Sequence, residues 1–125
     1  KPCIFERKYV YIDRDAFDVF KMHEAAQAFV GTHDFSAFCG NKHFKKSTVR
    51  AIQSFNVVKT EDEIVFTVTG NGFLQYMVRI MVGTLLEVGR GQRSAESIPL
   101  LFGGDRANAG PAVPSSGLCL MEVKY

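Results

Sequence analysis

A single arginine interrupts the most apolar stretch of this 125-residue sequence. Arg79 lies within NGFLQYMVRIMVGTLLEVGRG, a run that predicts one helix from Phe73 to about Val88. An unpaired buried charge is very costly, and a guanidinium pairs best with a carboxylate or a phosphate. The polar residues that share its side of a helical wheel are Gln75, Tyr76, Gly83, Glu87 and Arg90. This narrow stripe either faces water or lines a cleft in which Arg79 meets an anion, and the pattern leaves both alternatives open.

Gly83 follows Arg79 by one helical turn. Glycine costs roughly 1 kcal/mol of helix propensity relative to alanine, so its place within the helix needs a reason. The missing side chain lets another segment of the chain approach the helix closely. A stripe that lines a cleft would use such an approach, whereas a stripe that only faces water would not.

A second group of candidate functional residues is basic. Residues 35–60, called the basic stretch below, hold five cations and no acidic side chain. Cations neutralise phosphates and release counterions, and interleaved aromatic rings can stack on unpaired bases. Composition alone favours the alternative, a solvated loop in which Phe35 and Phe38 anchor the chain to the core. The residues predicted to bind RNA are Lys42, Lys45, Lys46 and Arg50.

Composition and spacing argue against several other classes of protein. Cys3, Cys39 and Cys119 are too far apart for a metal knuckle or a disulfide framework, so the sequence predicts no metal site and a reducing compartment. The apolar segment of the long helix has 16 residues and contains an arginine, whereas a bilayer span needs about 20 apolar residues. No secretory signal is recognisable at the start. We therefore expect a cytoplasmic protein that does not interact with membranes.

The elements that must position these residues indicate an α+β fold in a single domain over residues 1–125. Strands alternate with helices in the order β-α-β-β-α-(α)-β, which predicts an antiparallel sheet with helices packed on one face. Asp15 or Asp18 is expected to cap the first helix, and Gly31 to end it. Residues 32–47 are expected to form a loop. The predicted strands are Arg7–Ile12, Val49–Val58, Ile64–Thr69 and Leu118–Tyr125, and a short helix is expected from Ser94 to about Phe102.

Four linked motifs are more specific than these patterns. They are MHEAAQAFVGTHDFSAFC, STVRAI, GNGFLQYMVRIMVGTLLEVGRG and DRANAGPAVPSSGLCLMEVKY. In this order they resemble the C-terminal half of the tRNA pseudouridine synthase A family, from about Arg7 to Tyr125. The resemblance implies the pseudouridine synthase fold and an enzyme that isomerises uridine to pseudouridine. The implied substrate is the tRNA anticodon stem-loop, at tRNA positions 38, 39 and 40. It implies no metal, no organic cofactor, and a homodimer when the enzyme is whole.

The resemblance also assigns roles to residues of the long helix. In the family, the arginine of the M-V-R segment pairs with a catalytic aspartate of a G-R-T-D-A-G-V-H-A motif. Carried over, this arginine is Arg79, and Asn71 and Phe73 belong to the substrate pocket. Met77 and Val78 turn away from Arg79 on the wheel and are expected to pack in the core.

The sequence departs from the family in one important respect, because it contains no G-R-T-D-A-G motif. Asp105 lies in GGDRANAG, which matches the separate D-R-x-x-A-G-P segment, so it is a poor candidate nucleophile. The family's base-stacking tyrosine should precede residue 1, and Tyr9 or Tyr11 is the weaker alternative. We expect a C-terminal domain that lacks the half with the catalytic aspartate and is inactive alone. The alternatives are a stand-alone RNA-binding module and a dimerisation domain.

Overall fold

The computed structural model describes residues 3–12, 16–41 and 43–124, with side chains for all of these except Cys3 and residues 117–124. Asp15, Lys42 and Tyr125, which the sequence analysis had singled out, therefore lie outside the described residues.

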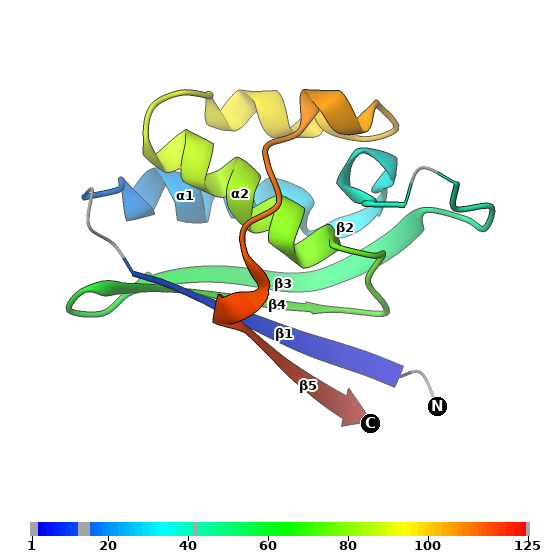
Figure 1. Cartoon of the computed structure of the whole chain (residues 1–125), viewed down its shortest axis with the longest axis horizontal. Helices are drawn as coiled ribbons and strands as arrows, with labels where there is room; N and C mark the ends of the chain where they lie inside the picture. The colour runs from blue at the N-terminus through cyan, green and yellow to red at the C-terminus, as the bar shows by residue number, and fades with distance from the viewer. Residues whose placement is uncertain (1–2, 13–15, 42, 125) are drawn as a thin grey trace.

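Five strands form one sheet with the order β2-β3-β4-β1-β5, and every neighbouring pair is antiparallel. The strands are β1 (Cys3–Ile12), β2 (Gly31–Asp34), β3 (Val49–Lys59), β4 (Glu63–Gly70) and β5 (Leu118–Lys124). Helices α1 (Val19–Ala26) and α2 (Met77–Gly89) cover one face of this sheet, and the 3-10 segment η3 (Ala95–Leu101) packs against α1 on the same side (Figure 1). The predicted α+β fold, with helices on one face of an antiparallel sheet, is confirmed.

Side chains alternate strictly along β4, as the period of a strand requires. Ile64, Phe66 and Val68 are buried beneath the helices, while Val65 and Thr67 on the other face remain partly exposed. The same alternation puts Tyr9 of β1 on the helix side, where it pairs with Phe66 in the ladder. The strands predicted over Val49–Val58 and Ile64–Thr69, which correspond to β3 and β4, are confirmed.

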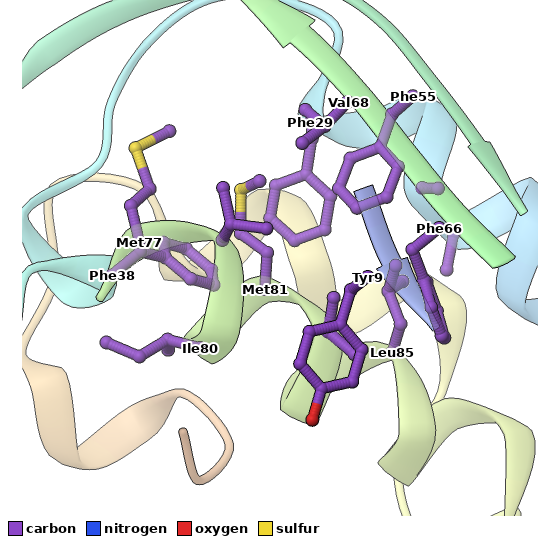
Figure 2. Packing of buried hydrophobic residues seen from close by; sticks show 14 of the residues in the cluster. Tyr9, Phe29, Phe38, Phe55, Phe66, Val68, Met77, Ile80, Met81 and Leu85 are labelled. Atoms are coloured by element: carbon purple, nitrogen blue, oxygen red, sulfur yellow. The ribbon is translucent and has the colours of Figure 1, made fainter. Parts of the chain in front are cut away.

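The core lies between the sheet and α2. Phe29 packs against Phe38 and Phe55 with ring centroids 5.2 Å and 5.6 Å apart, and Met81 and Leu85 of α2 cover this group (Figure 2). Burial of such large side chains supplies most of the stabilising free energy in a chain of this size. The core therefore fixes α2 against the sheet, and with it the position of Arg79.

Asp18, one of the two residues predicted to cap the first helix, is its N-cap. The Asp18 carboxylate accepts a hydrogen bond from the Lys21 N–H at 3.1 Å and caps α1. The predicted end at Gly31 is wrong: α1 ends at Ala26, and a 3-10 turn (Gln27–Phe29) follows. Gly31, at φ +113°, instead opens β2.

The predicted loop over residues 32–47 is partly wrong, because its first residues belong to β2. His33 pairs with Arg50 of β3 in the ladder, and Asp34 pairs with Val49. The four residues of β2 have weak strand propensity, so the exposed edge of β3 decides their conformation. The short helix predicted after Ser94 is the 3-10 segment η3.

Candidate active site

Arg79 lies in a cavity of about 330 Å³ at the start of α2, called the arginine cavity below. The chain leaves β4, turns through residues 71–76 and enters α2, so this wall comes from one continuous segment. β1 and the segment before β5 close the other side. The lining residues are Arg7, Phe73, Leu74, Gln75, Tyr76, Met77, Val78, Arg79 and Ser115. Arg79 thus faces a concave surface.

The helix that carries Arg79 starts later than the sequence suggested. Residues 73–76 are not helical, because Tyr76 has φ 63° and ψ 8° and α2 begins at Met77. A left-handed conformation is unusual for a bulky side chain, and Gly40 explains how it is held. The Gly40 N–H donates to the Gln75 carbonyl at 2.8 Å, and a Cβ at Gly40 would lie 2.1 Å from Cδ2 of Tyr76. A tertiary contact therefore overrides the local helical pattern.

The Arg79 side chain is fixed by hydrogen bonding and by an aromatic ring. Its Nε donates to the Val113 carbonyl at 2.6 Å, and its guanidinium lies 4.8 Å from the centre of the Tyr76 ring. No carboxylate pairs with it in the part of the chain that the structure describes. The ion pair that α2 makes joins Arg93 Nε to Glu87 Oε1 at 3.1 Å. The two terminal nitrogens of Arg79 are therefore available to an anion.

Gly83 has the close neighbour that its position predicted. Residues 110–114, called the crossing segment below, run across α2 toward β5 (Figure 1). A Cβ at Gly83 would lie 1.7 Å from the Pro111 carbonyl oxygen, a distance that no side chain can occupy. The Gly110 N–H donates to Thr84 Oγ1 at 2.9 Å, and the Val113 N–H donates to the Arg79 carbonyl at 3.1 Å. The crossing segment is thereby fastened to the helix turn that carries Arg79.

Tyr9 fastens the same segment from the sheet. Its hydroxyl donates to the Pro114 carbonyl at 2.6 Å, and its ring is 3% exposed and packs edge-on against Phe66. Burial raises the pKa of the Tyr9 hydroxyl, and the nearby positive charge of Arg79 partly opposes this. A buried ring has no face free for a base, so the weaker alternative that Tyr9 stacks on the target is wrong. Tyr11 is half-buried, and its ring meets that of Phe17.

A family model described as tRNA pseudouridine synthase matches residues 25–125. The chain belongs to the tRNA pseudouridine synthase family. It is similar to tRNA pseudouridine synthase A of Clostridium kluyveri, at 44% identity over all of this chain and 52% of that protein. It is also similar to tRNA pseudouridine synthase A of Geotalea uraniireducens, at 47% identity over 90% of this chain and 46% of that protein. The chain thus spans about half the length of the curated relatives it matches.

A second arginine, which the sequence patterns did not predict, faces the arginine cavity. Arg7 lies on β1 with its guanidinium 5.1 Å from the centre of the Phe73 ring, and burial lowers its pKa. Alternation along β1 puts Arg7 on the same face as Tyr9, two residues further on, but does not by itself place it in the cavity.

The two predicted pocket residues have different surroundings. Phe73 lines the arginine cavity, as expected of a residue at its mouth. Asn71 does not: its Oδ1 accepts the Ala51 N–H at 2.9 Å and its own N–H donates to the Ala51 carbonyl at 3.0 Å. These two bonds join the end of β4 to β3. Met77 and Val78 are buried, as expected.

No residue of the basic stretch lines the arginine cavity, although Gly40 contacts Gln75 and Tyr76 in its wall. Lys45 and Lys46 are exposed, and Arg50 Nη1 donates to the carbonyls of Ser47 and Val49, at 2.8 Å each. The two phenylalanines expected to be anchors, Phe35 and Phe38, are fully buried. The stretch borders a different cavity of about 620 Å³, which Asp105 also lines.

The described residues offer neither a metal site nor a membrane span. Within them, no three His, Cys, Asp or Glu side chains are grouped closely enough to hold a metal ion. No helix among these residues has the length and apolar character needed to cross a bilayer.

Proposed function

We propose that this chain forms the C-terminal half of a tRNA pseudouridine synthase active site, and that Arg79 pairs with a catalytic aspartate from the N-terminal half. One observation carries the proposal. Arg79 is held by Val113 and Tyr76 while its terminal nitrogens face a cavity without a carboxylate partner among the described residues. A half-buried guanidinium held in this way can pair with one anion through its terminal nitrogens.

Pairing with Arg79 would act on the aspartate in two ways. A nearby fixed cation favours the ionised form, so the pKa of the carboxylate would fall. The two terminal N–H groups of a guanidinium also fit the two oxygens of a carboxylate, which fixes the orientation of the group. The aspartate would then be ready for the reaction, in which the glycosidic bond of uridine breaks, the base rotates, and the bond re-forms through carbon.

The proposed substrate is the tRNA anticodon stem-loop, with uridines at tRNA positions 38, 39 and 40 as targets. The relatives are named tRNA pseudouridine synthase A. The exposed Lys45 and Lys46, with Lys42 and Arg50 beside them in sequence, would attract the phosphates of the stem. A homodimer, a cytoplasmic location and a reaction without metal or organic cofactor belong to the same proposal, since the family resemblance implies them.

The test is a chimera in which this chain replaces the matching half of the Clostridium kluyveri enzyme. Unmodified tRNA is incubated with the chimera, and pseudouridine is mapped at positions 38, 39 and 40. We expect modification by the chimera and none by the 125-residue chain alone, because the aspartate comes from the other half. A folded but inactive chimera, or clear turnover by the chain alone, would overturn the proposal.

A further inference from the structure

Arg7 is the second cation of the arginine cavity, and no role has been assigned to it. It lies on the helix side of β1, and its guanidinium is stacked on Phe73 at 5.1 Å. Among the described residues no group accepts a hydrogen bond from Arg7 and no carboxylate pairs with it. The aromatic contact covers one face of the guanidinium but satisfies none of its five N–H donors. The chain thus holds a partly buried charge that lacks an acceptor.

A purely structural role would not explain this arrangement. Arginine remains protonated in proteins, so partial burial does not remove the charge. Burial lowers the pKa of Arg7, as expected for a cation that is partly removed from water. An aliphatic side chain could pack against Phe73 without this cost. An anionic ligand would supply the missing acceptors and so offset the free-energy cost of partly burying the Arg7 charge.

Arg7 and Arg79 present different parts of the guanidinium to the cavity. Arg79 uses Nε to bind Val113, so its remaining edge suits a single carboxylate. Among the described residues nothing binds either edge of the Arg7 guanidinium, and such an edge suits a phosphodiester with its two non-bridging oxygens. The hydroxyl of Ser115 and the amide of Gln75 line the same cavity and could bind neutral parts of a nucleotide. About 330 Å³ is within the usual range for a small-molecule site.

We propose that Arg7 binds a backbone phosphate of the RNA next to the target uridine. The cavity would then receive two anions from different sources, an aspartate at Arg79 and a phosphodiester at Arg7. Arg7 is a substrate-binding residue in this scheme, and it would keep the target nucleotide in place while its base is detached. The inference rests on the proposed function, because it takes the ligand to be RNA.

The experiment measures binding of an anticodon stem-loop RNA to the 125-residue chain at several salt concentrations. Arg7→Gln removes the charge, and Lys8→Gln is the matched control. Lys8 is the next residue of β1, points to the opposite face by strand alternation and does not line the cavity. We expect Arg7→Gln to weaken binding about tenfold and to reduce the salt slope by about one. Lys8→Gln should leave both quantities nearly unchanged.

A set of RNAs, each with one neutral methylphosphonate linkage, locates the contact. One linkage next to the target uridine should weaken binding to the unsubstituted chain but have no further effect on Arg7→Gln, because the same contact is already lost. Arg7→Lys should recover part of the salt slope, since it restores the charge without the planar donors. Circular dichroism and thermal unfolding verify that each variant is folded.

The proposal is overturned if Arg7→Gln binds like the unsubstituted chain, or if no linkage loses its effect in that variant. The proposal is also overturned if the unsubstituted chain binds the RNA only as weakly as Arg7→Gln is expected to bind it. These failures differ from failure of the proposed function. An active chimera with an unchanged salt slope refutes the role of Arg7 alone, whereas an inactive chimera refutes the enzyme.

Discussion

Arg79 and the lysines of the basic stretch are all cationic, but the chain holds them in opposite ways. Arg79 is tied to Val113 and stacked on Tyr76, and its helix is bound to the core. Lys45 and Lys46 extend from an exposed segment. Rigid placement is required where two oxygens must be matched, whereas attraction of a phosphate backbone depends mainly on the number of charges. The first region is suited to chemistry, and the second to attracting the substrate.

The largest effect should come from Arg79→Lys in the chimera. A single ammonium keeps the charge but cannot pair with both oxygens of a carboxylate. We expect turnover at saturating tRNA to fall by at least about a hundredfold, as for other losses of a precisely placed donor. Arg93→Lys is the control, because Arg93 pairs with Glu87 and does not line the arginine cavity. Nearly normal turnover by Arg79→Lys would show that Arg79, like the lysines of the basic stretch, acts only through its charge.

The next effect concerns the crossing segment that fixes Arg79. Gly83→Ala should destabilise the chain by about 3 kcal/mol, because its Cβ must displace backbone rather than a flexible side chain. Gly91→Ala is the control: Gly91 has φ +78° and no atom within 4 Å of an added Cβ, so only backbone strain of about 1 kcal/mol applies. Urea denaturation of the two variants gives the comparison. Equal losses would show that the crossing segment is loosely held.

The sequence predicted those features of the structure that follow from local composition or from a single apolar face. The β-branched residues of β3 and β4 predicted two strands, and the apolar run of α2 predicted a buried helix. Gly83 predicted a close neighbour before that neighbour could be identified as Pro111. These features depend on local chemistry or on a single face, so they can be read from neighbouring residues.

Features that depend on distant contacts could not be predicted. Tyr76 adopts its left-handed conformation against Gly40, which is 36 residues earlier in the sequence. β2 exists because it pairs with β3, and its composition alone favours a loop. Arg7 reaches the cavity only because the register of β1 and the turn before α2 bring it to Phe73. The sequence therefore predicted a pocket with Arg79 and Phe73, but not that Arg7 lines it with them.

A smaller effect should follow from Tyr76→Asn, which tests how far stacking fixes Arg79. Asparagine tolerates the left-handed conformation that costs tyrosine about 1–2 kcal/mol. This gain roughly offsets the lost cation–π contact of about 0.5–1 kcal/mol. We expect stability to change by less than about 1 kcal/mol, while turnover of the chimera falls severalfold because Arg79 has more freedom. Tyr76→Phe retains the ring and should be nearly normal. Unchanged turnover for Tyr76→Asn would mean that Val113 alone fixes Arg79.

The smallest effect on chemistry should come from the basic stretch. Changing Lys45 and Lys46 together to alanine removes two exposed charges that pack against nothing essential, so the free energy of unfolding should stay within about 0.5 kcal/mol. Each lost phosphate contact lowers the slope of affinity against salt by about one, so the double substitution should lower it by about two.

In the chimera with both lysines replaced, KM should rise and turnover at saturating tRNA should remain normal, because the lysines act before the reaction. Lys8→Ala together with Lys21→Ala is a control of equal charge, since both residues lie outside the basic stretch and neither lines the arginine cavity. An unchanged salt slope would assign Lys45 and Lys46 to a solvated surface. A fall in turnover without a change in KM would instead show that the two regions are coupled.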